Sequence, residues 1–377
     1  MKTLFALLRA SPRYLQVYRT SKQTVLSHIT WNQITPVVVP IALAALQQQE
    51  HRATQNNHGT LCETLENARQ TTMRKSYEIP LETSRMLLQF HENVEFFISD
   101  FVVSRLPIIE NYLYPETSHL STKASWYGAA SPKIGRALSQ TEYSRLARAF
   151  YHLELYGSLF SRLDAEEDDT SVSEQSCDFL QSLKDWELEE LLCVRDYLIE
   201  RLTEYLNQVE DDFMQGFLED EPHIIETAGP DSRWNNVDWF FSDDAHGQFQ
   251  EGWLQGCLSR GLEEIRAILT ADTSEARFDA LGSTDLAPNP FGRALEALPT
   301  KLSPWRTCCS GNDCKNAKYI DDAEKHNAAW SWAIKGRRHP RSFPDYANNP
   351  SYTGLRRWGY MIWDYERLES LGILSQE

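Results

Sequence analysis

SQTEYSRLARAFYHLELYGSLF, residues 139–160, is the clearest amphipathic helix in the sequence. Ser139 and Glu142 have the spacing of a capping box, in which each side chain bonds the backbone N–H of the other residue. Apolar residues then recur at steps of three and four, which is one helix face: Tyr143, Leu146, Phe150, Leu153, Gly157 and Phe160. Arg145, Arg148 and Glu154 lie on the other side. A stripe this aromatic requires a large apolar partner.

The expected partner is a second long helix over residues 186–217, WELEELLCVRDYLIERLTEYLNQVEDDFMQGF. Its apolar residues also recur at helical spacing: Leu191, Val194, Leu198, Leu202, Tyr205, Val209 and Phe213. Between the two helices, residues 164–176, DAEEDDTSVSEQS, are acidic and polar, and we predict an exposed loop there. Two long helices joined by such a loop predict a helical hairpin.

Further helices are predicted on both sides of this hairpin. Ser-Pro at residues 11–12 and Thr-Pro at residues 35–36 each predict a helix start with proline in the first turn. We expect the first of these helices to continue to Ile29 and the second to end near Gln49. Other helices are predicted over residues 61–73, 81–106 and 253–269. Pro107 is expected to end or kink the helix that precedes it.

The fold class that these patterns predict is all-α, an irregular multi-helix domain with a tryptophan-rich C-terminal segment. Residues 361–363, MIW, are the only tempting strand, and that run is too short to carry a sheet. The tryptophans of the C-terminal segment are Trp305, Trp330, Trp332, Trp358 and Trp363. We expect the core to be built by Phe90, Phe97, Phe101, Phe150, Leu153, Phe160, Leu191, Leu198 and Trp363.

The composition is that of a folded and acidic chain. Of its 377 residues, 41% are hydrophobic and 11% are aromatic, which is ample for a core. The formal net charge of −17 argues against a general affinity for nucleic acid or for anionic lipid. The apolar run over residues 37–46 is far shorter than the ~20 residues that a membrane span needs. We therefore expect neither a nucleic-acid partner nor a membrane partner.

The cysteines favour a reducing compartment. They are odd in number and mostly isolated, which does not suit a disulfide framework: Cys62, Cys177, Cys193, Cys257, Cys308, Cys309 and Cys314. The N-terminal apolar run is cut by Arg9, so it does not read as a signal peptide. We expect an intracellular protein, cytoplasmic or nuclear. The basic run from Lys335 to Arg341 is either a nuclear import signal or a balance for nearby acid.

The candidate metal ligands are Cys308, Cys309 and Cys314, with His326 downstream. Structural zinc takes four ligands in a tetrahedron, usually from paired short loops. The C-C-x4-C cluster has no second pair of ligands at such a spacing. Incidental thiols in a loop are the favoured interpretation, so we predict no metal, no cofactor and no catalytic residue.

Two other patterns carry weaker chemical signals. Residues 211–215, DDFMQ, resemble the aspartate-rich motif with which all-α terpenoid synthases bind diphosphate through magnesium, but Gln215 replaces the third carboxylate. His91 and Glu95 resemble a helical metalloprotease motif whose second histidine is replaced. A charged helix end and a solvated or core-edge helix face are the simpler interpretations of these two patterns.

The N-terminal stretch LFALLRASPRYLQVYRTSKQTVLSHIT, residues 4–30, resembles the later half of a degenerate F-box in a large group of fungal proteins. The resemblance rests on a leucine-rich helix followed by Ala-Ser-Pro and Tyr14. It continues in four further blocks, at residues 87–101, 138–160, 186–198 and 355–374. The Leu-Pro opening of a complete F-box is missing, which by the resemblance is either a genuine truncation of the box or a mis-set start codon.

This resemblance implies partial F-box-like helices over residues 1–50 and a large helical domain over residues 51–377. In F-box proteins the box docks on the small adaptor subunit of a cullin ubiquitin ligase. By the resemblance, Pro12, Tyr14 and Tyr18 are the candidate partner-binding residues.

Our first hypothesis is therefore a protein-interaction module, similar to the substrate-receptor part of an F-box-like protein, with no catalysis of its own. The alternative is an all-α enzyme or accessory protein acting on a small hydrophobic molecule, with Asp211, Asp212 and His91 as the groups to suspect. A third hypothesis is that the C-terminal tryptophans form an exposed patch for a partner helix.

Overall fold

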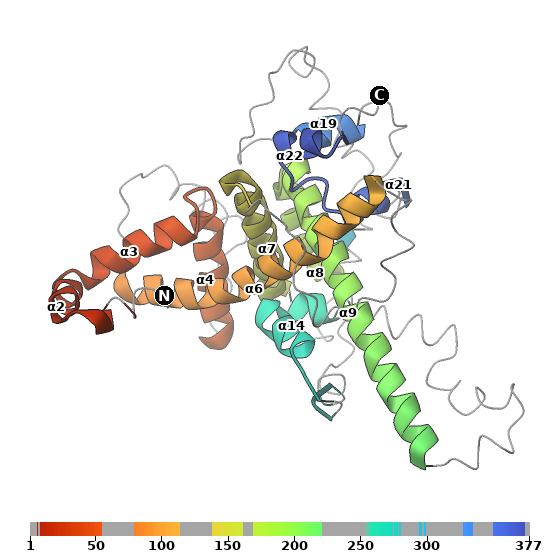
Figure 1. The fold of residues 1–377 in the computed structure, drawn as a ribbon, viewed down its shortest axis with the longest axis horizontal. Helices are drawn as coiled ribbons and strands as arrows, with labels where there is room; N and C mark the ends of the chain where they lie inside the picture. The colour runs from red at the N-terminus through yellow and green to blue at the C-terminus, as the bar shows by residue number, and fades with distance from the viewer. Residues whose placement is uncertain are drawn as a thin grey trace, which may run out of the picture.

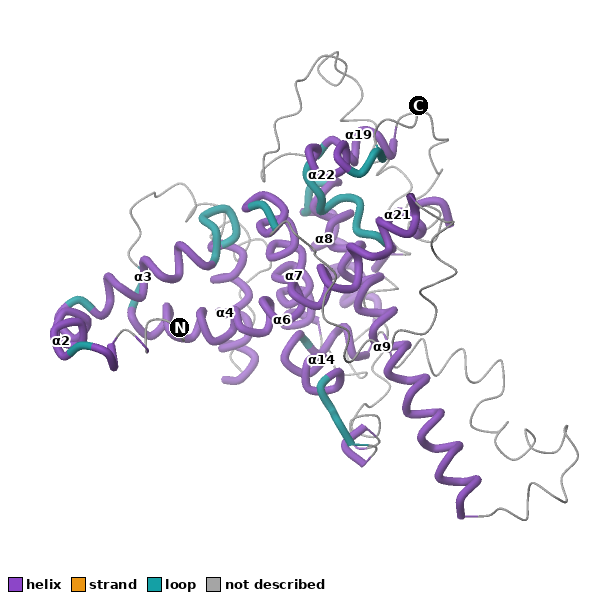
Figure 2. The backbone as a smooth tube through the Cα atoms, in the orientation of Figure 1, coloured by secondary structure: helices purple, strands orange, loops and turns teal. Residues whose placement is uncertain are grey.

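The computed structural model describes residues 6, 8–54, 79–113, 138–160, 169–220, 254, 256–273, 275–277, 279, 294–295, 298, 327–334 and 350–373. Within these ranges every regular element is an α-helix, which confirms the all-α prediction (Figures 1 and 2). The helices are α2 (Pro12–Thr20), α3 (Lys22–Gln33), α4 (Val39–Thr54), α6 (Leu81–Leu113), α7 (Gln140–Phe160), α8 (Asp169–Ser182), α9 (Asp185–Asp220), α14 (Leu262–Leu269), α19 (Ala328–Ile334), α21 (Pro350–Arg357) and α22 (Tyr365–Ser370).

The helix that organises the fold is α7, which lies in the middle of the molecule and packs against α4, α6, α8 and α9 (Figure 1). Its capping box forms as predicted: the backbone N–H of Ser139 donates to Glu142 Oε2 at 3.0 Å, and that of Glu142 donates to Ser139 Oγ at 3.1 Å. All nine predicted core residues are buried, and they belong to one hydrophobic cluster.

The helical hairpin is present, but the loop predicted over residues 164–176 is wrong from Asp169 onward. There the chain forms α8, which lies between α7 and α9 in sequence. Near the end of α8, Phe179 is buried against the rings of Tyr156 and Phe160. This packing explains a helix that the acidic sequence did not predict, because burial outweighs weak local propensity.

Two predicted helix boundaries at the N-terminal side are also wrong. The helix expected over residues 12–29 is broken at Ser21, which separates α2 from α3. Conversely, Pro107 does not end the helix that precedes it, since α6 continues to Leu113; the alternative, a kink at this proline, stays a prediction. Leu106 and Ile109 are buried on either side of this proline. Their packing offsets the cost of about 3 kcal/mol for proline inside a helix.

The helix expected over residues 253–269 is interrupted at Gly261. Gly261 has a φ of 102°, a conformation that side chains with a Cβ rarely adopt. A Cβ there would lie 2.9 Å from Glu154 Oε1. The carboxylate of Glu154 accepts the backbone N–H of Leu262 at 2.6 Å, so it holds the first turn of α14 against α7. The helix predicted over residues 61–73 lies outside the described residues.

The first helices share the core of the main body. Residues of α4 such as Ala42 and Ala45 are buried in the same cluster as Leu87 of α6 and Phe150 of α7. Thr35 and Ser144 are joined by a buried hydrogen bond of 2.9 Å between their hydroxyls. Helices on both sides of the predicted division at residue 50 therefore share one hydrophobic core, and α4 itself runs across residue 50. The division itself stays a prediction.

The C-terminal tryptophans are mostly buried. Trp330, Trp358 and Trp363 belong to the core cluster, and Trp332 is partly buried against it. The hypothesis that these side chains form an exposed patch is therefore wrong for Trp330, Trp358 and Trp363, because all three are packed in the core. Trp305 lies outside the described residues.

Candidate functional site

The three predicted partner-binding residues all lie on α2, the helix at the left-hand edge of Figure 1. Pro12 occupies the first helical position, as predicted, and it is exposed. Tyr14 is 51% exposed, whereas Tyr18 is partly buried. None of the nine residues of α2 is buried. A helix this short with no buried residue is only weakly stabilised by the chain itself.

Val17 completes an apolar stripe on α2 that sequence reasoning did not assign to a site. It is 54% exposed, and it lies three residues after Tyr14, which puts both side chains on one helix face. The exposed large hydrophobic residues of the described chain are Tyr14, Val17, Met86 and Val103. Two of these four therefore lie on α2.

The support under α2 is ordered and buried. It packs against α3, and α3 packs against α6. Leu26, Ser27 and Thr30 are the buried residues of α3. The hydroxyl of Ser27 accepts the backbone N–H of Ile79 at 3.3 Å, which joins α3 to the segment leading into α6. The arrangement presents α2 at the edge of a packed body.

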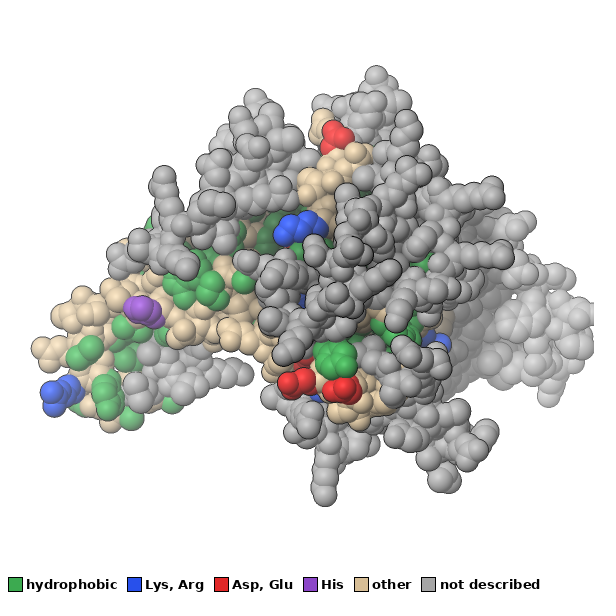
Figure 3. Space-filling view, turned by 90° about the horizontal axis from the view of Figure 1, so that it is seen from above, with side chains coloured by type: hydrophobic (Ala, Val, Ile, Leu, Met, Phe, Trp, Pro, Cys, Tyr) green, Lys and Arg blue, Asp and Glu red, His purple; other side chains and the backbone are tan. Residues whose placement is uncertain are grey.

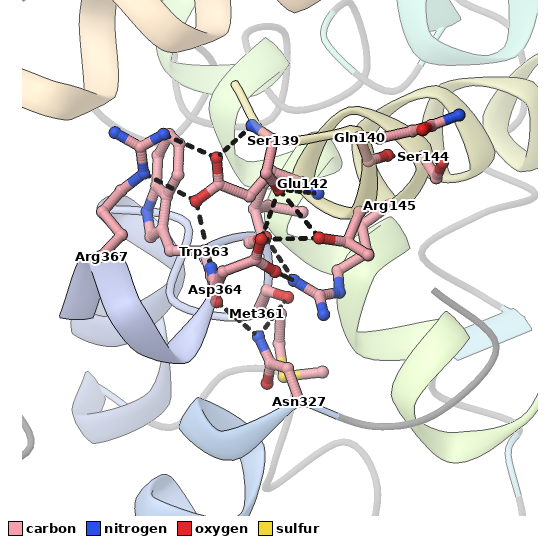
Figure 4. Close-up of polar contacts among 12 residues, drawn as sticks. Ser139, Gln140, Glu142, Ser144, Arg145, Asn327, Met361, Trp363, Asp364 and Arg367 are labelled. Atoms are coloured by element: carbon pink, nitrogen blue, oxygen red, sulfur yellow. Dashed lines mark hydrogen bonds and ion pairs between the residues drawn. The ribbon is translucent and has the colours of Figure 1, made fainter. Parts of the chain in front are cut away.

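A polar clasp joins the start of α7 to the C-terminal segment (Figure 4). Arg367 of α22 donates to both carboxylate oxygens of Glu142, at 2.6 Å each. The same carboxylate accepts the backbone N–H of Asp364 at 3.1 Å. Glu142 is therefore both the capping-box residue of α7 and the anchor of the chain's last helix. Because it is buried, these charge-assisted bonds are among the stronger ones in the fold.

Asp364 is the second carboxylate of the clasp. It accepts hydrogen bonds from the hydroxyls of Ser139 and Thr141, the latter at 2.6 Å. Its other oxygen accepts from Arg145 Nη1 at 2.7 Å, and Arg145 also donates to the backbone carbonyl of Ile362 at 2.9 Å. The polar side of the predicted α7 helix is thus buried by a segment more than 200 residues away in sequence. The clasp therefore joins two distant parts of the same chain, the start of α7 and the C-terminal segment.

Two more buried ion pairs join α7, α9 and α21. Arg356 donates to Glu189 at 2.9 and 3.1 Å, and the Tyr360 hydroxyl donates to the same carboxylate at 2.9 Å. Arg148 donates to Glu190 at 3.0 and 2.8 Å. These charges lie inside the protein, so each is costly unless its partner stays in place.

Stability should depend on pH through Glu190. Burial raises the pKa of Glu190 to about 7 from an ordinary value of 4.5, although Arg148 opposes this shift. The folded state then holds this proton more tightly than the unfolded state. The contribution to stability is full below pH 4.5 and is lost as the pH rises to about 7. At 1.36 kcal/mol per pKa unit, the loss is on the order of 3 kcal/mol.

We expect Glu190→Gln to remove this dependence, which urea unfolding between pH 5 and pH 7.5 would measure. The advantage of the wild type over Glu190→Gln should fall by about 2–3 kcal/mol across that range. Glu82→Gln, which changes an exposed carboxylate on α6, is the matched control. Parallel stability curves for the wild type and Glu190→Gln would contradict the prediction.

His91 is buried in a network of hydroxyl groups. Its Nδ1 lies 2.9 Å from the Tyr151 hydroxyl, and its Nε2 lies 2.7 Å from the Tyr143 hydroxyl. Tyr143 donates to Glu95 Oε1, and this carboxylate oxygen also lies 3.2 Å from His91 Nε2. The hydrogen bond from His91 lowers the pKa of Glu95, whereas burial raises the pKa of Tyr143. Of the two simpler interpretations of this motif, the solvated face is wrong for His91 and the core-edge face is confirmed, because His91 is buried whereas the side chain of Glu95 is 47% exposed.

The other chemical candidates are not brought into a common site. Asp212 of α9 forms an ion pair of 2.8 Å with Arg277, so its carboxylate has a structural partner. The side chain of Asp211 lies outside the described part, as do Cys308, Cys309, Cys314 and His326. Among the described residues, no group of three or more His, Cys, Asp or Glu side chains is arranged to hold a metal ion. None of the described helices combines the length and the apolar character that crossing a membrane requires.

Comparison of the chain with protein-family models, with curated proteins and with solved structures found no significant match in any of the three.

Proposed function

We propose that this chain is a protein-interaction module that binds its partner through α2, similar to the substrate-receptor part of a fungal F-box-like protein. One observation carries the proposal: none of the residues of α2 is buried, and Tyr14 and Val17 are both about half exposed. Aromatic and aliphatic side chains on an exposed helix face are typical anchors of a protein interface. A partner that buries them would also stabilise this short helix.

The resemblance of the N-terminal stretch supplies the first partner to test, the small adaptor subunit of a cullin ubiquitin ligase. On this proposal the interaction takes place inside the cell, in the cytoplasm or the nucleus. The rest of the fold would carry α2 and hold a substrate protein elsewhere on its surface. We advance no second function, because His91 and Asp212, which the enzyme hypothesis would use, are each engaged with neighbours in the fold.

The test is a calorimetric titration of the full chain with the purified adaptor subunit. Removing both apolar anchors, in the double variant Tyr14→Ala/Val17→Ala, should weaken binding at least thirtyfold, since interface anchors of this kind contribute about 1–2 kcal/mol each or more.

The matched control is Val103→Ala, because Val103 is 56% exposed, like Val17, but lies on α6. This variant should bind as the wild type does. Two results would overturn the proposal: no binding by the wild type, or equal binding by the double variant.

A further inference from the structure

The N-terminal region differs in charge from the rest of the chain. Residues 1–49 contain no Asp or Glu, and their basic residues are Lys2, Arg9, Arg13, Arg19 and Lys22. The whole chain has a net charge of −17, so the remaining residues are more acidic still. The charge of this segment is therefore opposite to that of the whole protein. A partner that binds here meets a positive surface.

The structure puts this charge beside the apolar stripe. Arg13 and Arg19 are exposed on α2, and Arg9 is exposed just before it. Arg13 lies one helical turn from Val17, so a cation flanks the apolar anchors on the same face. Seen from above, the end of the molecule where α2 lies shows hydrophobic and basic side chains, and none of the described side chains at that end is acidic (Figure 3). α3, on which α2 packs, has no acidic residue either.

The position of α2 at the edge of the molecule keeps this positive charge effective. At physiological ionic strength, charges are screened over about 8 Å. A docking partner therefore interacts more strongly with exposed arginines at its contact surface than with any acidic residue more than this distance away. Arginine also bonds carboxylates through two parallel N–H groups, which adds orientation to attraction.

We propose that α2 docks on an acidic protein surface, one with an apolar hollow for Tyr14 and Val17 and with carboxylates around it that pair with Arg9, Arg13 and Arg19. The inference rests on the proposed function and names the chemistry of its partner. Apolar anchors inside a rim of charge are the usual anatomy of protein interfaces. A phosphate backbone would use the arginines but not Val17, so an acidic protein accounts for more of the surface.

The direct probe is a synthetic amphipathic helical peptide with leucines on one face and glutamates on the other, titrated into the full chain by fluorescence anisotropy. The comparison peptide has every glutamate replaced by lysine. At 50 mM salt we expect the acidic peptide to bind at least about tenfold more tightly than the basic one. At 500 mM salt this ratio should fall to about threefold or less, because the charges are screened.

Charge reversal on α2 identifies the residues responsible. Arg13→Glu/Arg19→Glu should weaken binding of the acidic peptide at least about tenfold at 50 mM salt. The matched control is Arg357→Glu, which reverses an exposed arginine on α21 and should leave the affinity unchanged.

The outcomes separate this inference from the proposed function. If the adaptor binds the charge-reversed variant as tightly as the wild type, but does not bind Tyr14→Ala/Val17→Ala, the proposed function stands and the acidic partner is wrong. If the acidic peptide depends on the arginines and the adaptor does not bind, the surface chemistry stands and the adaptor is excluded. Binding of phosphatidylserine vesicles or single-stranded RNA, with no preference for the acidic peptide, would overturn the inference.

Discussion

Arg356→Ala should lower the free energy of unfolding by about 3–5 kcal/mol, because it leaves a buried carboxylate without its cation. Arg356 and Glu189 are both fully buried, and two hydrogen bonds of 2.9 and 3.1 Å join them. The Tyr360 hydroxyl also donates to Glu189, but it carries no charge. The pair joins α21 to α9, so its loss should loosen the C-terminal segment first.

The measurement is urea unfolding followed by circular dichroism, with Arg85→Ala as the matched control. Arg85 pairs with Glu82 on the exposed face of α6, and this variant should cost about 0.5 kcal/mol or less. The double variant Arg356→Met/Glu189→Leu should recover most of the lost stability, because it removes both buried charges together. If Arg356→Ala costs no more than Arg85→Ala, the ion pair does not have the role assigned to it.

Asp364→Ala should lower the free energy of unfolding by a similar amount, about 3–5 kcal/mol, because buried Arg145 would lose the carboxylate of Asp364. The hydroxyls of Ser139 and Thr141 would lose an acceptor at the same time. The change should also release the C-terminal segment from α7. Amide hydrogen exchange over residues 358–373 should therefore accelerate more than exchange in α9.

Glu366→Ala is the matched control for the clasp, since it removes an exposed carboxylate two residues away, in α22. We expect this change to stay within about 0.5 kcal/mol of the wild type. Asp364→Asn keeps one oxygen acceptor, so its free energy of unfolding should lie between those of Asp364→Ala and Glu366→Ala. Equal stability of Asp364→Ala and Glu366→Ala would show that the clasp does not hold the segment.

Local patterns predicted the parts of the fold in which local and tertiary preferences agree. Ser139 and Glu142 formed the expected capping box, and Phe150 lies in the core as its periodicity indicated. The same reasoning failed where tertiary contacts outweigh local signals. Pro107 is tolerated inside α6 because its neighbours are buried, and Asp169 begins a helix in a stretch whose sequence is typical of an acidic loop.

The buried ion pairs could not be predicted from the sequence, and the reason is physical. Periodicity assigned Arg145 to the polar side of its helix, and a polar side is normally solvated. Its partner, Asp364, lies 219 residues away, so no local pattern could connect them. The candidate surface was partly predicted: the resemblance gave Tyr14 and Tyr18, whereas the exposure of Val17 and the partial burial of Tyr18 required the structure.

The most direct test of the central claim, that α2 is the helix on which a protein partner docks, is amide hydrogen exchange of the full chain with and without the purified cullin-ligase adaptor. Because α2 buries none of its residues in the free chain, its amides should exchange readily there. With saturating adaptor, exchange over residues 12–20 should slow by at least about tenfold, as expected for a helix that becomes buried. Unchanged exchange over residues 12–20 at saturation would contradict the account.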